Sequence, residues 1–271
     1  MSEGYKTVEY TDNGKTLYTV VPSDAIVVAG DNTLADALNT ANDGDTILVM
    51  AGTFATPSTF DKSVTIKGVG AEMSFLDTKN AYFQSLGANL TFEDISFNGF
   101  ANPYNHTSMG IQGAANQTFN NVTFHGEFHV FTGNATFNNC AFVYDAATGT
   151  NYQLWCQTNG TVDVNNCTMD CANGRAILVY GWPGASGQPA NNTVGGDINI
   201  NGLTVTSTGN SSDKAVVEIH SELYTSAGTI NINNLTYSPQ SDFAGLWRDV
   251  NSTTKFYTVY VNGQLVQQGN N

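Results

Sequence analysis

One short pattern recurs seven times along the 271 residues, and it constrains the fold more than any other feature of the sequence. The copies read VTIKGVGA, LTFEDISF, QTFNNVTF, ATFNNCAF, VDVNNCTM, ININGLTV and ININNLTY. A chain that repeats one small structural unit stacks each copy on its neighbour, so the pattern predicts a solenoid. The third residue of each copy is apolar and serves as the anchor of the alignment: Ile66, Phe92, Phe119, Phe137, Val164, Ile200 and Ile232.

The position two residues after each anchor holds only glycine, asparagine or aspartate. These residue types enter the left-handed αL conformation at least cost, and one such residue bends a strand sharply. The columns that run from Val64 to Ile230 and from Val69 to Leu235 are predicted to point inward, and residues on either side of the bend, such as Thr91 before it and Thr123 after it, to alternate outward. We expect the bend residues to form one file along the stack, with asparagine amides hydrogen-bonded from coil to coil. The seven bend positions are Gly68, Asp94, Asn121, Asn139, Asn166, Gly202 and Asn234.

A second β-rich run precedes most anchors, as in residues 109–114 (MGIQGA) and 176–181 (AILVYG). Near the start, DNTLADALNTANDGDTILVMAGTFA (31–55) combines one apolar helix face, a capping pair of Thr33 and Asp36, a strand and a turn. Over about residues 30 to 240 the chain resembles the right-handed parallel β-helices of the pectin-lyase-like superfamily. That resemblance implies an all-β solenoid whose first coil is plugged by a helix over 33–42.

The predicted organisation has three parts. Residues 1–29 form an N-terminal hairpin and cap segment, 30–240 the parallel β-helix, and 241–271 a C-terminal cap with a β-hairpin. The hairpins are expected around Asp12-Asn13-Gly14 and Asn262-Gly263, because Asn-Gly between β-rich runs favours a tight turn.

Charge excludes several classes of partner. The chain has 9 Lys+Arg against 23 Asp+Glu and a net charge of −14, so it cannot build the basic stripe that binding to nucleic acid requires. It also lacks a run of roughly 20 apolar residues, so we expect no membrane insertion. A polar but weakly charged chain of this kind suits an extracellular, cell-surface or virion-surface location. The four cysteines are expected to be buried free thiols.

The superfamily includes polysaccharide lyases and glycoside hydrolases, so the resemblance raises the question of catalysis. A lyase of this type would need carboxylates, a basic residue and, as its one expected cofactor, Ca²⁺; otherwise no cofactor is predicted. Only His125-Gly126 matches a hydrolase motif of the superfamily, and the adjacent aspartate pair and the Arg-x-Lys are missing. The alternative for the remaining candidates is a surface salt link between Asp170 and Arg175, or a solvated polar face on the strand that carries Glu218 and His220. Those candidates form two groups: Asp163, Asp170 and Arg175, and Glu218, His220 and Glu222.

The run His125-Gly126-Glu127-Phe128-His129 is a further candidate, for a metal site. If it were one strand, both imidazoles and the carboxylate would share a face. Same-face residues on one strand stand nearly 7 Å apart, however, which suits a solvated polar face better than a set of metal ligands.

Aromatic residues in loops and at strand ends suggest a surface for stacking on sugars. The favoured hypothesis is therefore a non-catalytic, adhesin-like or virion-fibre-like module that binds a glycan or cell-surface polysaccharide. The alternatives are a lyase or hydrolase that acts on an extracellular polysaccharide, and a purely structural spacer. The oligomeric state stays open, with a homotrimer as one option. The candidate glycan contacts are Tyr104, Trp155, Tyr180, Trp182 and Trp247.

Overall fold

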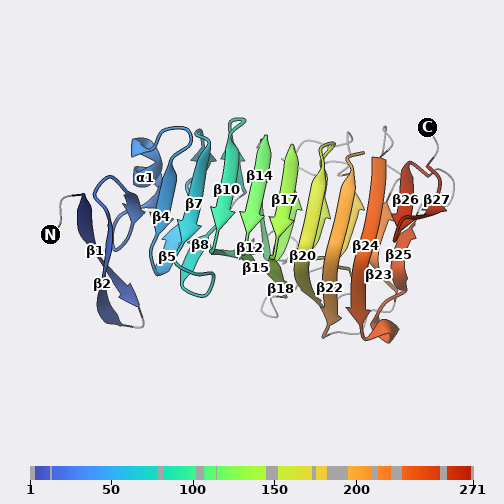
Figure 1. Ribbon diagram of the computed structural model, residues 1–271. Coiled ribbons are helices and arrows are strands. Elements are labelled where there is room, and N and C mark those ends of the chain that lie inside the picture. The colour runs from blue at the N-terminus through green and yellow to red at the C-terminus, as the bar shows by residue number, and fades with distance from the viewer. Residues whose placement is uncertain are drawn as a thin grey trace.

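The computed structural model describes residues 4–12, 14–78, 82–101, 107–113, 115–144, 152–172, 175–181, 195–208, 213–220, 228–250 and 255–269. It shows an elongated stack of short strands with the chain ends at opposite ends of the stack (Figure 1). Each strand pairs in parallel with the equivalent strand of the next coil, so the predicted right-handed parallel β-helix is confirmed.

The 16-stranded sheet covers two faces of the coil. Its first face consists of β3 (Ile26–Val28), β4 (Thr46–Val49), β7 (Val64–Gly68), β10 (Asn89–Glu93), β14 (Asn116–Asn120) and β17 (Asn134–Asn138). Its second face consists of β5 (Gly52–Ala55), β8 (Ser74–Asp77), β11 (Ser96–Asn98), β15 (Thr123–His125) and β18 (Ala141–Val143). Three longer strands bend across both faces: β20 (Val162–Cys171), β22 (Ile198–Ser207) and β24 (Gly228–Ser238).

A nine-stranded sheet, called the third sheet below, closes the coil. Its parallel strands are β6 (Thr59–Phe60), β9 (Phe83–Ser85), β13 (Thr107–Gln112), β16 (Glu127–Val130), β19 (Leu154–Cys156), β21 (Ile177–Tyr180), β23 (Ala215–His220) and β25 (Gly245–Asp249). The short β12 (Phe100–Ala101) pairs antiparallel with β13, and a 3₁₀ turn, η2 (Gln240–Asp242), precedes β25.

The left-handed bend is confirmed at six of its seven predicted positions. Asp94, Asn121, Asn139, Asn166 and Asn234 have φ between 51° and 54°, and Gly202 has φ 84°. Gly68 is the exception, because it ends β7 and the positive φ falls at Gly70. A Cβ on Gly68 would lie 2.3 Å from the Asp94 carbonyl oxygen, so glycine is needed there for close backbone approach. The prediction that Val69 points inward is therefore wrong, and the residue is 39% exposed.

The asparagine ladder exists, but its long run lies one position before the bend. Asn138 Nδ2 donates to Asn120 Oδ1 at 2.9 Å, and Asn165 Nδ2 donates to Asn138 Oδ1 at 3.0 Å. The ladder continues through Asn201 and Asn233. These side chains point outward and satisfy one another along the stack, since the coils repeat at the spacing of parallel strands.

Phenylalanine stacks fill the middle of the coil. The rings of Phe92, Phe119 and Phe137 are parallel within 8°, with centroids 5.4 and 4.9 Å apart. The same in-register stacking that aligns the outer amides therefore aligns the inner rings. All four cysteines are buried and unbridged, as predicted.

The N-terminal end of the stack is covered by helix α1 (Leu34–Thr40), close to the predicted 33–42. Thr33 accepts a hydrogen bond from the Asp36 backbone N–H at 3.0 Å and donates its hydroxyl to the Asp36 carboxylate at 2.6 Å. At the other end of the helix, Lys62 Nζ donates to the carbonyl oxygens of Leu38 and Ala41. The apolar face of α1 thereby closes the core.

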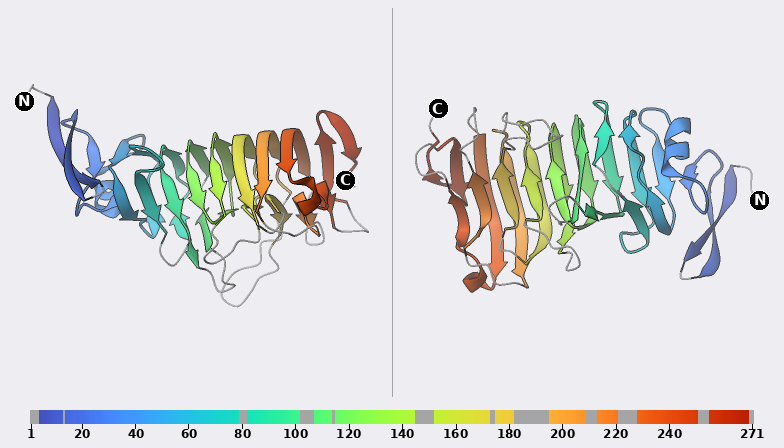
Figure 2. Two further views of the ribbon diagram at one scale, coloured as in Figure 1. Left: turned by 90° about the horizontal axis from the view of Figure 1, so that it is seen from below. Right: turned by 180° about the vertical axis from the view of Figure 1, so that it is seen from behind.

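Hairpins flank the stack at both ends. Strands β1 (Tyr5–Asp12) and β2 (Lys15–Pro22) form a separate two-stranded sheet that projects past the end of the coil (Figure 2). At the far end, β26 (Tyr257–Val261) pairs in parallel with β24 and antiparallel with β27 (Gln264–Gln267). The stacked strands begin at β3, within the 1–29 segment, and continue to β26, within the 241–271 segment. In the described part of the chain, no helix has the length and apolar content needed to cross a membrane.

Candidate functional site

The third sheet brings chemically active side chains into one column on its outer surface. The strand register aligns one outward residue from each coil. Along each strand these outward residues alternate with inward ones such as Phe128 and Leu154. Several of these outward side chains are nevertheless buried, including those of His129, Trp155 and Glu218. We call this set the outer column: Tyr82, Gly110, His129, Trp155, Leu178, Glu218 and Arg248.

Four residues form an arginine cluster at the C-terminal end of the outer column: Arg175, Glu218, His220 and Arg248. Arg175 Nε donates to Glu218 Oε1 at 2.8 Å, and His220 Nε2 donates to the same oxygen at 2.9 Å. Arg248 Nη2 donates to Glu218 Oε2, which also accepts the Ala215 backbone N–H at 3.4 Å. The carboxylate thus holds two donors on each oxygen, which is the full acceptor capacity of a carboxylate.

The arginine cluster fixes the protonation state of its carboxylate. Burial of Glu218 opposes ionisation, but the His220 hydrogen bond and the charges of Arg175 and Arg248 outweigh burial. Together they hold the pKa of this carboxyl well below its ordinary range. Glu218 is therefore a permanent anion near neutral pH and is unsuited to act as a general acid.

A second group, the histidine cluster, lies towards the middle of the stack and comprises Tyr82, Glu127, His129 and Tyr152. The hydroxyl oxygens of Tyr82 and Tyr152 lie 3.3 Å from His129 Nδ1 and 3.4 Å from His129 Nε2. Glu127 Oε2 is 3.6 Å from His129 Nε2. Burial, followed by the nearby Glu127 carboxylate, raises the pKa of Tyr152 well above its ordinary value, so its hydroxyl stays protonated.

Gly110 makes room for the histidine cluster. It sits between Tyr82 and His129 in the outer column, and a Cβ there would lie 2.7 Å from the His129 carbonyl oxygen and 2.9 Å from the Phe131 ring. Trp155 connects the two clusters: its ring is 4.9 Å from that of His129 and stacks on Tyr180 at 6.0 Å, and its Nε1 donates to the Tyr180 carbonyl oxygen. Tyr180 in turn lies 5.1 Å from the His220 ring.

The structure regroups the predicted catalytic residues. Arg175 joins Glu218 and His220 instead of Asp170. Asp163 points outward on the first face, where its Oδ1 accepts a hydrogen bond from Asn199 at 2.8 Å, and Asp170 lies in the second-face part of β20. The first predicted group is therefore split over separate faces. Glu222 lies outside the described residues.

The predicted metal site is divided by a corner of the coil. His125 ends β15 on the second face, whereas Glu127 and His129 belong to β16 in the third sheet. Gly126, with φ 124°, turns the chain between them. The expected solvated face is also wrong for Glu127 and His129, which are both buried. Within the described ranges, no group of three or more His, Cys, Asp or Glu side chains is arranged to hold a metal ion.

The structure also places the aromatic candidates in different environments. Trp155 and Tyr180 lie on the outer surface of the third sheet and stack on each other. Trp247 pairs with the inward residue Val217 and packs against the core. Tyr104 and Trp182 lie outside the described residues.

Sequence reasoning missed Tyr82, Tyr152 and Arg248 as members of these clusters. Arg248 follows the inward-facing Trp247, and this alternation places it beside Glu218. Aligning the strands that precede the anchors by their inward residues would have shown this register. The contacts of Tyr82 and Tyr152 depend on where loops lie, which no repeat pattern specifies.

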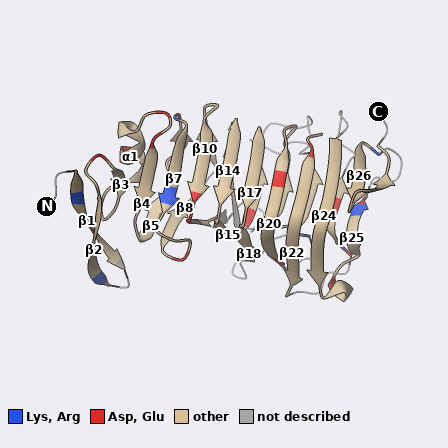
Figure 3. Cartoon of the chain, viewed as in Figure 1, with Lys and Arg blue, Asp and Glu red and all other residues tan. Residues whose placement is uncertain are grey.

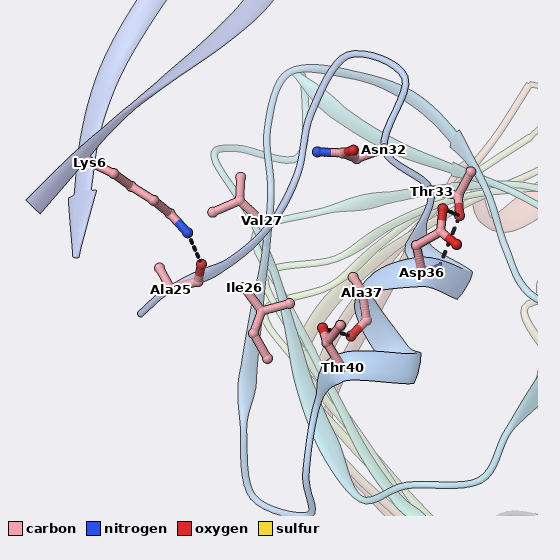
Figure 4. A pocket seen from close by; sticks show the side chains of 9 residues that line it. All are labelled: Lys6, Ala25, Ile26, Val27, Asn32, Thr33, Asp36, Ala37 and Thr40. Carbon is pink, nitrogen blue, oxygen red and sulfur yellow. Dashed lines mark hydrogen bonds between the residues drawn. The ribbon is translucent and has the colours of Figure 1, made fainter. Parts of the chain in front are cut away.

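A shallow pocket at the N-terminal end is a weaker candidate (Figure 4). It lies between the β1–β2 hairpin and α1, and four of its polar side chains already have partners. Lys6 Nζ donates to the Ala25 carbonyl oxygen at 2.6 Å, and Thr40 donates to the Ala37 carbonyl oxygen. Thr33 and Asp36 are engaged in capping the helix. These hydrogen bonds therefore stabilise the junction between the coil and the hairpin.

Comparison with known proteins gives similarity at the level of fold. No family model matches the chain, and no curated protein matches it. Among solved structures, a pectin methylesterase from Aspergillus niger has a TM-score of 0.48 at 12% identity, covering 90% of this chain and 87% of that one. A variant of the PL6 family alginate lyase AlyGC has a TM-score of 0.47 at 14% identity, covering 90% of this chain and 39% of that one.

Proposed function

We propose that the protein is a non-catalytic β-helix module that binds a glycan on the third sheet and works outside the cell or on a virion surface. The binding surface is the sugar patch, defined as Tyr180, His220 and Arg248. The observation that carries the proposal is their arrangement: three half-buried side chains that can stack and donate hydrogen bonds stand over the buried support of Trp155 and Glu218. A ring beside fixed donors suits a sugar, which offers an apolar face and a rim of hydroxyls.

The carboxylates of the outer surface favour binding over hydrolysis. Glu218 is held as an anion by four donors, so it has neither a proton to give nor a free acceptor site. Among the described residues of this outer surface, the other buried carboxylate is that of Glu127, which lies three strands away along the stack, or about 14 Å at the spacing of parallel strands. Glycoside hydrolases need two carboxyl groups roughly 5 to 9.5 Å apart.

One observation favours a second candidate function, a polysaccharide lyase or hydrolase. Tyr82, His129 and Glu127 form a hydroxyl–imidazole–carboxylate chain of the kind in which a carboxylate orients a base that activates a hydroxyl. Tyr82 is half-buried, so its hydroxyl is the member of the chain closest to a substrate's reach. In this reading the sugar patch binds the polymer and the histidine cluster acts on it.

A glycan array followed by calorimetry on the best ligand tests the proposal. Wild-type protein should bind at least one glycan, and Tyr180→Ala should weaken binding by about tenfold, because a stacked ring contributes roughly 1 kcal/mol or more beyond its buried area. Tyr18→Ala is the matched control, since Tyr18 is 64% exposed on the distant hairpin. Equal binding by Tyr180→Ala and wild type would place the ligand elsewhere and contradict the proposal.

Incubation with the bound glycan separates the two functions. The favoured function predicts no new reducing or unsaturated ends over many hours, with or without Ca²⁺. Product formation by wild type that is lost in Tyr82→Phe would instead establish the enzyme. Tyr180→Ala would then raise KM with little change in kcat, because it alters binding and leaves the histidine cluster intact.

A further inference from the structure

We infer that the glycan bound at the sugar patch carries an anionic group, a carboxylate or a sulfate ester, and that Arg248 binds it. This inference rests on the proposed function and specifies the ligand of the same patch. It follows from where this acidic chain places its positive charge.

Both arginines of the chain, Arg175 and Arg248, meet at the same carboxylate. Among the described residues of this cluster, the two guanidinium charges exceed the single charge of Glu218 by one before His220 is counted. Among the described acids near the patch, Asp249 Oδ1 lies 3.7 Å from Lys255 Nζ and Asp213 Oδ2 lies 3.1 Å from Lys214 Nζ, so each has a cation beside it. The patch is thus a positive spot on a molecule of net charge −14. Basic segments are few over the described chain, and one lies on β25 (Figure 3).

The two arginines have different roles. The Arg175 side chain is 10% exposed and supports Glu218 from within, whereas that of Arg248 is 38% exposed and borders solvent. Arg248 Nε is buried without a hydrogen-bond partner in the described structure, and Nη2 is the atom that contacts Glu218. A guanidinium has five N–H donors, and because the buried Nε cannot reach a ligand, the donor capacity of Arg248 towards solvent lies on the Nη groups of its 38% exposed side chain. Oxyanions with two acceptor oxygens are the groups that best match this fork.

A neutral sugar would not need this arrangement. Hydroxyls are bound well by neutral amides and hydroxyls, which this chain has in abundance on its other faces. A polyanion, by contrast, is repelled by a chain of charge −14 unless its charged group meets a local excess of positive charge. Glu218 holds this positive charge in place, because it accepts hydrogen bonds from Arg175, Arg248 and His220 at once and so fixes their positions. Its own single negative charge cancels only one of their positive charges.

The test is calorimetric titration with three matched oligosaccharides that share one backbone: neutral, uronate-bearing and sulfate-bearing. Wild type should bind one or both anionic forms about tenfold or more tightly than the neutral form, since charge-assisted hydrogen bonds are roughly twice as strong as neutral ones. Arg248→Gln should remove that preference and its dependence on salt, while the weaker binding of the neutral form persists. Arg248→Lys, which keeps the charge but loses the planar fork, should restore the salt dependence and only part of the affinity.

Lys67→Gln is the control for net charge, because Lys67 lies on the first face beside Glu93 and its loss also lowers the charge by one. Circular dichroism and thermal melts identify any variant that fails to fold. Equal wild-type affinity for neutral and anionic forms, or an equal loss of both in Arg248→Gln, would overturn the inference and leave the glycan proposal standing. If no oligosaccharide binds and the array is also silent, the proposed function fails with it. The tighter of the two anionic forms identifies the source of the charge.

Discussion

At the scale of single residues, glycine, asparagine and arginine each have a structural role that depends on the chemistry of that residue type. Gly68 and Gly110 permit contacts that a Cβ would block. Asn139 and its equivalents hold the left-handed bend that most residues adopt only at a cost. Against the effect of burial, the His220 hydrogen bond together with Arg175 and Arg248 lowers the pKa of Glu218 and keeps it ionised, where an isolated buried carboxylate would be neutral.

The depressed pKa of Glu218 predicts a specific dependence of stability on pH. Its folded-state pKa lies below the ordinary value of 4.5, so its contribution is complete above that pH and is lost as the pH falls further. Glu218→Gln should lower the free energy of unfolding at pH 7 by about 3 kcal/mol, because it leaves two guanidinium groups without their anion. Denaturant titrations of wild type and Glu218→Gln from pH 7 to pH 3 measure the difference between their free energies of unfolding. That difference should become smaller below about pH 4.5.

Glu93→Gln is the control for that experiment, since Glu93 pairs with the half-exposed Lys67 on the first face. Surface pairs contribute roughly 1 kcal/mol or less, so this variant should stay close to wild type. A pH-independent difference for Glu218→Gln would mean that the carboxyl titrates normally and that the arginine cluster does not hold it.

At the scale of secondary-structure elements, each strand gains from its neighbours in three ways: backbone pairing, inner ring stacks and outer amide ladders. The repeat predicted the first and the existence of the third. It placed the long ladder on the bend residues, whereas the structure places it one residue earlier. Among the bend residues, Asn121 Nδ2 donates to Asp94 Oδ1 at 2.7 Å, whereas the outward residues one position earlier form the longer run, through Asn120, Asn138 and Asn165.

The ladder predicts a position-specific loss of stability. Asn138 both donates to Asn120 and accepts from Asn165, so Asn138→Ala should lower the free energy of unfolding by about 1 to 2 kcal/mol. Thr136→Ala, on the same strand and the same outer face, should cost less than half as much, since its side chain lies outside that ladder. Equal losses in urea titrations of the two variants would show that the ladder adds nothing to strand pairing.

At the scale of the whole molecule, the sequence was sufficient to predict the architecture but insufficient to predict the site. The bends, the inward columns and the capping helix follow from local chemistry repeated at each coil, so Phe92, Asn166 and Leu38 could be placed before any coordinates. The arginine cluster joins residues 175, 218 and 248, from three coils. Whether these three residues meet depends on the lengths of the loops that connect the strands of each coil, and the repeat pattern does not specify those lengths.

The capping helix makes a prediction about the state of the whole molecule. Leu38 is buried against the core, so Leu38→Asp should expose the first coil and the strand edges beside it. Light scattering should then show aggregates that grow with protein concentration. Asn39→Asp on the exposed side of the same helix should remain like wild type, and a monodisperse Leu38→Asp protein would show that the helix is dispensable as a cap.

The equal register of successive coils has a consequence for how such a molecule changes in evolution. Phe92, Phe119 and Phe137 occupy equivalent positions although 27 and then 18 residues separate them. Duplicating the gene segment between two equivalent positions would therefore insert a coil whose upper and lower surfaces already fit its new neighbours. The length of such a protein can therefore change by whole coils without a new packing surface between coils. The side chains that form a site on the existing coils stay the same.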